Sequence, residues 1–184
     1  MYRIACMSTA SSFLFPLTGR AQQSPAAATS SCAGPEAAAF DFTVGRWRGT
    51  ERRINGRDTT VSASALVEVT TLAGGCALLE QLTVGDSVSG GFRGVLLRGY
   101  DRAGSRWMYT FVSNFQHFLV WEGRLEEGRW WFYRQGASGD SLQSRLSWAP
   151  VAGGVRETGQ ESADGGRTWR VVTIIDHTPL PEAW

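Results

Sequence analysis

The amino-acid sequence predicts an all-β protein, an antiparallel barrel of about ten strands with a short helix before the first strand. The chain of 184 residues contains 22 glycines and 8 tryptophans. Runs of aromatic and β-branched residues recur at intervals of about 10 to 13 residues, and short turns with glycine, aspartate or asparagine separate them. Few stretches show the period of an amphipathic helix, so strands are expected to form nearly all of the fold.

Residues 1–21 are typical of an export signal. Arg3 supplies a positive charge, residues 4–17 are apolar and small, and residues 19–21 offer a small-x-small cleavage site. The apolar stretch is too short and too rich in serine and threonine to span a bilayer well. We therefore expect a secreted or periplasmic protein with no membrane span. A disordered tail or a misassigned start codon is the alternative.

A linker and a short helix are expected next. Residues 22–34 are small and polar, which favours a flexible linker. Residues 35–44 favour one short helix, because Pro35 suits the first helical position and a glutamate and three alanines follow it. Phe40 and Phe42 are expected to plug an apolar opening.

The barrel is expected over residues 35–178, with residues 179–184 as a C-terminal tail. Most connections are short enough to be hairpins, and no stretch is available for a crossover helix, which excludes a parallel sheet. Closure into a barrel removes two exposed sheet edges; a two-sheet sandwich is the alternative. The expected strands are residues 46–54, 59–71, 77–84, 91–101, 106–113, 117–125, 129–135, 142–149, 154–161 and 168–176.

Aromatic residues occupy both faces of two predicted strands. In residues 106–113, Trp107, Tyr109 and Phe111 share one face, and residues 129–135 carry aromatic side chains on both faces. Outward aromatic side chains need cover, which a homodimer would provide. A barrel of this strand number leaves room inside for a ligand.

The start of the first strand carries a family resemblance. Residues 45–47, Gly-Arg-Trp, follow the expected helix and resemble the Gly-x-Trp signature of the lipocalin-like (calycin) superfamily. Four stretches together resemble an uncharacterised secreted bacterial family of that superfamily: residues 32–36, residues 74–80, residues 99–101 followed by 106–107, and residues 162–169. The resemblance covers residues 32 to 169 and implies the barrel fold, but it carries no established reaction.

The resemblance also implies roles for single residues. Trp47 is expected to close one end of the barrel as an apolar plate against the helix. Superfamily members commonly stack an arginine on this tryptophan, and Arg170 on the last strand is the candidate. The chain departs from the family at Gly159 and Gln160, where relatives often carry an aromatic residue and a glutamate. If these positions line the interior, the pocket is roomier and differently polar than in the relatives.

Cys32 and Cys76 remain after removal of the signal. Two cysteines in an oxidising compartment suggest one disulfide, and both lie in stretches that carry the resemblance. Such a disulfide closes a loop of about 45 residues and contributes a few kcal/mol. Two unpaired thiols are the alternative.

Composition and spacing argue against several function classes. The formal net charge is +1 with scattered arginines, so no nucleic-acid partner is expected. The chain has no Gly-x-Ser-x-Gly motif, only two histidines, and no cluster with zinc-ligand spacing. No cofactor is expected. The chain is similar to the nitrobindins, which bind haem through a histidine near the C-terminus, so His177 is a candidate haem ligand. The glycine pattern that nitrobindins carry after the tryptophan is absent here after Trp47. The alternative is that His177 is a solvent-exposed residue at the end of a strand.

Glu80 is the most informative acid, because it follows two leucines inside an apolar strand. A buried carboxylate needs a partner or a function, and Arg98 or Arg145 can supply the partner. A structural ion pair, a ligand-anchoring pair and a general acid or base are the three interpretations. Glu122 and Glu157 are weaker cases of the same kind.

We therefore expect an exported carrier that holds a small, partly apolar ligand inside the barrel. Whether the chain is an enzyme stays open: an isomerase or cyclase that uses Glu80 is one alternative, and a protein-interaction module with outer tryptophans is another. Specificity is expected at the end of the barrel away from Trp47, around Glu80, residues 107–111 and the 113–118 hairpin. The expected ligand-binding residues are Glu80, Arg98, Tyr109, Phe111, Trp121, Tyr133 and Arg145.

Overall fold

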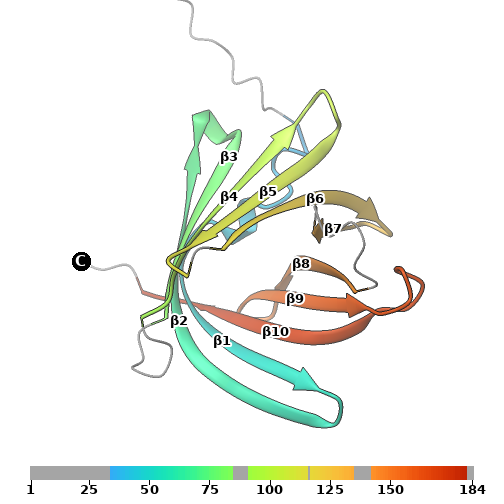
Figure 1. The fold of residues 1–184 in the computed structure, drawn as a ribbon. Coiled ribbons are helices and arrows are strands. Elements are labelled where there is room, and N and C mark those ends of the chain that lie inside the picture. Colours follow the sequence, from blue (N-terminus) through green and yellow to red (C-terminus); the bar gives the residue numbers. More distant parts are fainter. Residues whose placement is uncertain (1–33, 85–90, 116, 135–141, 182–184) are drawn as a thin grey trace, which may run out of the picture.

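Ten strands form one closed antiparallel barrel (Figure 1). The structure is a computed structural model that describes residues 34–84, 91–115, 117–134 and 142–181, without the side chains of residues 61–63. Each strand pairs with its neighbours in sequence, and β10 returns to pair with β1. This closure confirms the predicted all-β barrel and excludes the alternative of a two-sheet sandwich. The strands are β1 Gly45–Asn55, β2 Asp58–Leu72, β3 Ala77–Val84, β4 Arg93–Asp101, β5 Arg106–Ser113, β6 Phe118–Glu126, β7 Arg129–Arg134, β8 Gln143–Val151, β9 Gly154–Ser162 and β10 Arg170–Pro179.

Turn chemistry explains why the strands could be placed from the sequence. Every expected strand is present, and its ends differ from the expected ones by three residues at most. The turn between β6 and β7 shows the cause: Glu127 and Gly128 both have positive φ angles, of 51° and 77°. Two such residues form the tight turn whose twist matches that of the flanking strands, so the hairpin register follows from the turn.

The expected N-terminal α-helix is absent from the described residues. Residues 35–40 form hydrogen-bonded turns, and a 3₁₀ helix, η1 Asp41–Thr43, follows them. The run of three alanines is too short to sustain an α-helix without packing. Packing instead places Phe40 in the core, and the Trp107 Nε1–H donates to the Glu36 carbonyl at 2.9 Å. No helix in the described part of the chain is long and apolar enough to cross a membrane.

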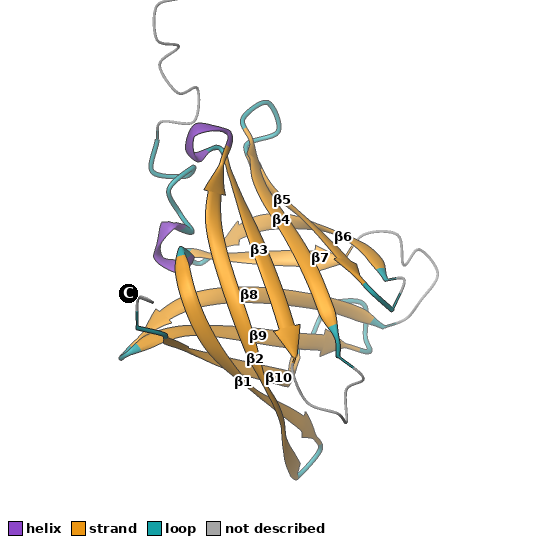
Figure 2. Cartoon of the chain, turned by 90° about the vertical axis from the view of Figure 1, so that its left-hand side faces the viewer, coloured by secondary structure: helices purple, strands orange, loops and turns teal. Residues whose placement is uncertain are grey.

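The N-terminal segment, residues 34–44, covers one end of the barrel, and this end is called the closed end below (Figure 2). Phe40 inserts between Trp107, Phe132 and Trp148, with ring centroids 5.0, 5.4 and 6.3 Å away. These rings meet edge to face or tilted, the arrangement that aromatic quadrupoles favour. The expectation that Phe40 plugs an apolar opening is confirmed. The opposite end, with the β1–β2, β5–β6 and β9–β10 connections, is called the open end.

Replacing Phe132 tests how much the closed end contributes to stability. Its side chain is fully buried, so Phe132→Ala is expected to lower the free energy of unfolding by about 3–5 kcal/mol. Urea denaturation measures the change. The matched control is Phe118→Ala, because Phe118 is 70% exposed, and its effect should stay within about 0.5 kcal/mol. Equal losses in the two variants would contradict this placement of the core.

Candidate functional site

Glu80 and Arg98 form a buried ion pair inside the barrel. The Arg98 Nη2 atom lies 3.1 Å from the Glu80 Oε2 atom and 3.1 Å from the Thr43 Oγ1 atom. The guanidinium group also lies over the ring of Trp148, with 4.7 Å from Cζ to the ring centroid. Of the two arginines considered from the sequence, Arg98 is therefore the partner of Glu80. The pair joins β3 and β4 to the segment that covers the closed end.

The electrostatic balance at Glu80 follows from its burial. Removal from water raises the pKa of the Glu80 carboxyl group, and the nearby charge of Arg98 opposes this rise. The charge of Glu157 also raises the Glu80 pKa, whereas His177 lowers it. Glu80, Arg98 and His177 line one cavity and Glu157 lies 3.7 Å from His177, so polar groups from β3, β4, β9 and β10 share one region of the interior. Among the described residues, no group of three or more His, Cys, Asp or Glu side chains is arranged to hold a metal ion.

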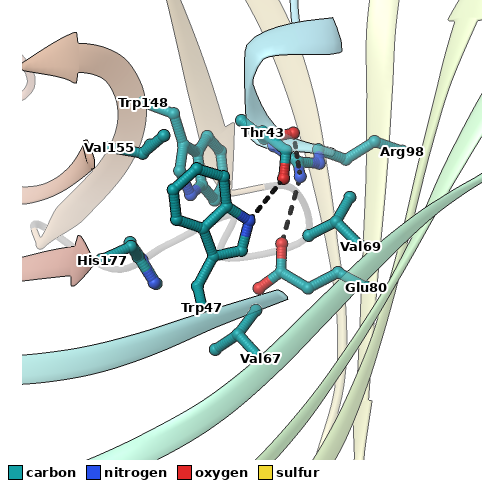
Figure 3. A pocket seen from close by; sticks show the side chains of 9 residues that line it. All are labelled: Thr43, Trp47, Val67, Val69, Glu80, Arg98, Trp148, Val155 and His177. Carbon is teal, nitrogen blue, oxygen red and sulfur yellow. Dashed lines mark hydrogen bonds and ion pairs between the residues drawn. The ribbon is translucent and has the colours of Figure 1, made fainter. Parts of the chain in front are cut away.

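A small cavity lies between these groups (Figure 3). Its free space of about 10 Å³ has room for the centre of about one water molecule. Figure 3 shows the second carboxyl oxygen of Glu80 turned away from Arg98, toward the side on which Trp47 and His177 lie. The lining residues are Thr43, Trp47, Val67, Val69, Glu80, Arg98, Trp148, Val155 and His177.

Trp47 lies beside this cavity, at the closed end as expected. Its Nε1–H donates to the Thr43 carbonyl at 2.8 Å, so the indole fixes the N-terminal segment against β1. Thr43 thus holds Trp47 through its carbonyl and Arg98 through its hydroxyl oxygen.

His177 and Glu157 form a second polar pair on the inner face. His177 lies directly opposite Val155 of the core, and its Nε2 atom is 3.7 Å from the Glu157 Oε2 atom. Neither ring nitrogen of His177 has a hydrogen-bond partner among the described residues, although the side chain is only 8% exposed. The alternative interpretation from the sequence, that His177 is exposed to solvent, is therefore wrong. A haem does not fit either, since the lined space beside His177 takes only about one water molecule.

Tyr109, Trp121 and Phe111 all lie on the inner face, as the alternation in β5 predicts. Tyr109 and Trp121 are buried cross-strand neighbours whose rings stack with centroids 6.0 Å apart. Phe111 is half-buried and lies nearer the open end. Burial raises the pKa of Tyr109 well above its usual value, and the charges of Glu157 and Glu80 add to the rise.

Tyr133 and Arg145 do not line the interior, which corrects the prediction for both. Phe132 faces the core, so its neighbour Tyr133 faces outward, and Arg145 is the cross-strand partner of Tyr133. The Arg145 guanidinium lies between two indole rings, 4.0 Å from the centroid of Trp131 and 4.2 Å from that of Trp169. Periodicity could not identify the outer face, because β7 is aromatic on both faces.

Hydrogen bonds complete this outer arginine cluster, which comprises Arg145, Trp131, Tyr133, Trp169 and Glu126. Arg145 donates from Nη1 to Glu126 Oε2 at 3.2 Å and to the Tyr133 hydroxyl oxygen at 3.0 Å. The Tyr133 hydroxyl donates to Glu126 Oε1 at 2.6 Å. Trp131 is buried and none of the described tryptophans is exposed, so those residues do not form the exposed patch considered for a protein-interaction module.

Arg170 does not stack on Trp47. Trp47 pairs with Pro179 at the closed end, whereas Arg170 begins β10 at the open end and pairs with Glu161. Their side chains, Arg170 Nη2 and Glu161 Oε2, lie 3.8 Å apart. The arginine that stacks on a tryptophan beside the cavity is instead Arg98, which lies over Trp148. Strand register separates the two ends of β10, and the expectation placed Arg170 at the wrong end.

The two positions at which the chain differs from the family that it resembles, Gly159 and Gln160, have different surroundings. Gly159 is on the inner face, but a Cβ there would contact the Leu146 Cδ2 and Thr173 Cβ atoms at 3.3 Å. The missing side chain therefore leaves no empty space. Gln160 faces outward and accepts a 2.8 Å hydrogen bond from Arg145 Nε, so it does not change the polarity of the interior.

The polar groups of the interior are closer to Trp47 than expected. Glu80 lies in the same cavity as Trp47, and Trp107 contacts the N-terminal segment, so both belong near the closed end. Only the 113–118 connection lies at the open end; residue 116 is outside the described residues. Sequence reasoning gave Glu157 little weight and His177 only a haem role, and the strand alternation that puts both inside is the signal that could have identified them.

The predicted disulfide involves a residue outside the described part of the chain. Cys76 is half-buried and directly follows the 3₁₀ helix η2 Ala73–Gly75, which connects β2 to β3. Cys32 lies in residues 1–33, as do the predicted signal and most of the linker, so the pairing stays a prediction.

A scan against known protein families and a search of curated proteins found no match to this chain.

Removing Arg98 tests whether Glu80 depends on its ion pair. Arg98→Met leaves the buried carboxyl group without its partner and is expected to lower the free energy of unfolding by about 3–5 kcal/mol at pH 7. The double variant Glu80→Gln/Arg98→Met should lose less than the sum of the single variants. Urea denaturation gives all three values. The control is Arg170→Met, since Arg170 is 62% exposed and its loss should cost below about 1 kcal/mol. Additive losses at Glu80 and Arg98 would contradict the coupling.

The connection between β9 and β10 gives a pH-dependent prediction. Hydrogen bonds from the Thr168 amide and hydroxyl groups and from the Ser162 hydroxyl group lower the Asp164 pKa from 3.8 to about 2. Because the folded pKa is depressed, the stabilisation is complete above the unfolded pKa and is lost as pH falls through about 2. Carboxyl carbon NMR should show this midpoint, and Thr168→Val should move it upward. An unchanged midpoint in Thr168→Val would count against the assignment.

Proposed function

We propose that this chain is an exported carrier that binds a small, partly apolar molecule inside the open half of the barrel. The residual exposure of inner-face apolar side chains near the open end carries this proposal. Phe111, Leu119 and Ile175 are half-buried although they belong to the inner face of a closed barrel. In contrast, Phe40 and Phe132 at the closed end are fully packed. Solvent thus reaches apolar surface inside the barrel, the kind of surface that a ligand can cover.

The polar groups deeper in the barrel support a ligand with one polar end. Glu157 and His177 lie on the inner face, and Glu157 is directly opposite Ile175. An apolar surface that ends in a few convergent polar groups is typical of small-molecule sites. Trp121 Nε1 adds a buried donor without a partner among the described residues.

An enzyme that uses Glu80 has less support. Arg98 holds one oxygen of this carboxyl group, and the other faces a cavity for about one water molecule. Substrate therefore has little room beside it. Glu80→Gln separates the two functions: it should change ligand affinity in a carrier and abolish turnover in an enzyme.

The resemblance to a secreted bacterial family of lipocalin-like barrels agrees with this proposal. A closed antiparallel barrel of ten strands is consistent with that fold. We propose membership of that family, export through residues 1–21 and a disulfide between Cys32 and Cys76 on the sequence motifs alone. Protein purified from its own periplasm or culture medium, with the first 21 residues removed, would support the export proposal; an intact N-terminus in the cytoplasm would refute it.

Filling the open half tests the carrier proposal. Ile175→Trp adds bulk on the inner face and should lower ligand affinity at least about tenfold, because the new ring occupies apolar space that the ligand needs. Native mass spectrometry of protein from its own host, followed by displacement of a fluorescent apolar dye, measures binding.

The neighbouring position provides a matched control. Ile174 is on the same strand, is also half-buried, and faces outward opposite Arg52 and Thr158. Ile174→Trp should therefore leave affinity unchanged. A clean unliganded mass together with no dye binding would refute a carrier, and equal effects of the two substitutions would refute the proposed location.

A further inference from the structure

We propose that the ligand of this barrel is a primary amine with an apolar tail, and that its ammonium group is held by Glu157 beside His177. This inference rests on the proposed carrier function and names the chemical class of its ligand. Three observations carry it: the charge pairing inside the barrel, the unpartnered nitrogens of His177, and the apolar surface that adjoins Glu157.

Besides Glu157, the inner face carries the carboxyl groups of Glu80, Glu51 and Glu161, and each of these three has an arginine within ion-pair distance, Arg98, Arg53 and Arg170 respectively. Arg98 is paired with Glu80 at 3.1 Å and is fully buried, so it balances the charge of only that carboxyl group. The one ion-pair partner of Glu157 among the described residues is His177, at 3.7 Å. Among the described residues, Glu157 therefore differs from these three acids in having no arginine within ion-pair distance, and a cation is the group that would pair with it.

Solvent exposure distinguishes Glu157 from Glu80. The Glu157 side chain is 14% exposed although it lies on the inner face, whereas Glu80 is 5% exposed and Arg98 is 0% exposed. Phe40 and its aromatic neighbours pack at the closed end, and Glu157 keeps more exposure to solvent than the buried ion pair, so it is the more accessible of the two acids.

The unpartnered ring of His177 is the second observation that points to a ligand. Its side chain is 8% exposed and both nitrogens are buried without a hydrogen-bond partner among the described residues. Leaving such groups unsatisfied costs stability. The Glu157 Oε2 atom lies 3.7 Å from the Nε2 atom of this ring, and a primary ammonium group carries three donors. A neutral imidazole nitrogen and the Glu157 carboxylate can accept two of these hydrogen bonds.

The surface around Glu157 explains the apolar tail. Ile175 is its direct cross-strand neighbour, and the half-buried rings and aliphatic chains of the open half lie on the same inner face. An ammonium group at Glu157 thus directs a tail toward this surface. A fatty acid in the same orientation would place a third carboxylate beside Glu157 and Glu80, which repulsion disfavours.

The test compares three compounds with the same eight-carbon tail on the full chain after removal of the signal: octylamine, 1-octanol and octanoate. Isothermal titration calorimetry should show octylamine binding about 10- to 100-fold more tightly than 1-octanol, the ratio expected for a hydrogen bond to a charged group. Octyltrimethylammonium, which keeps the charge but has no donors and a larger head, should bind more weakly than octylamine.

Two matched variants locate the effect. Glu157→Gln should remove the preference for octylamine over 1-octanol. Glu161→Gln changes the same residue type on the same strand and the same face, but nearer the open end beside Arg170, and it should keep the preference. Circular dichroism checks that both variants fold; if Glu157→Gln does not fold, the comparison with octyltrimethylammonium on the unmodified protein decides.

The outcomes separate this inference from the proposed function. Tight, equal binding of 1-octanol, octanoate and octylamine would overturn the amine ligand and leave the carrier intact. Tightest binding of octanoate, or a preference that survives in Glu157→Gln, would also overturn it. Failure of all the eight-carbon compounds and of the apolar dye to bind would overturn both.

Discussion

The buried contact between Glu80 and Arg98 is the interaction on which the rest of the structure depends. It joins neighbouring strands, and through Thr43 it also attaches the segment that covers the closed end. An arginine without water is costly to bury, so its surroundings must supply charge, hydrogen bonds and a flat surface. Glu80 supplies the charge, Thr43 accepts a hydrogen bond, and the ring of Trp148 provides the flat surface. The position of the N-terminal segment is therefore determined by electrostatics as much as by apolar packing.

The two ends of the barrel differ in how completely their inner-face side chains are buried. On the side of Arg98, aromatic rings and the N-terminal segment leave space for about one water molecule. On the other side, inner-face residues such as Phe111 and Ile175 keep part of their exposure. A barrel filled along its whole length would be more stable by the burial of that surface. The partial exposure of these inner-face apolar side chains is the observation on which the proposed binding role rests.

Most of the fold could be predicted from the sequence because local rules determine it. The turn at Glu127 and Gly128 requires positive φ angles, and alternation along β5 puts Tyr109 and Phe111 on one face. The partner of Glu80 was limited to two arginines for the same reason. The errors arose where local rules give no answer: Arg145 lies on a face that aromatic alternation leaves ambiguous, and the location of Arg170 depends on which end of β10 meets Trp47. The burial of His177 could not be predicted, because it depends on closure of all ten strands into a barrel.

The outer arginine cluster has a consequence for how the ring of strands is completed. Within the described residues, β7 and β8 share only the register pairs Phe132 with Leu146 and Tyr133 with Arg145. Among the described residues, this seam is the strand pair with the fewest register pairs. The stacked guanidinium of Arg145 joins Trp131 and Tyr133 on one side of this seam to Trp169 beyond the other. Between β7 and β8, side-chain contacts on the outer face thus supply part of the attachment that backbone hydrogen bonds supply between the other strands.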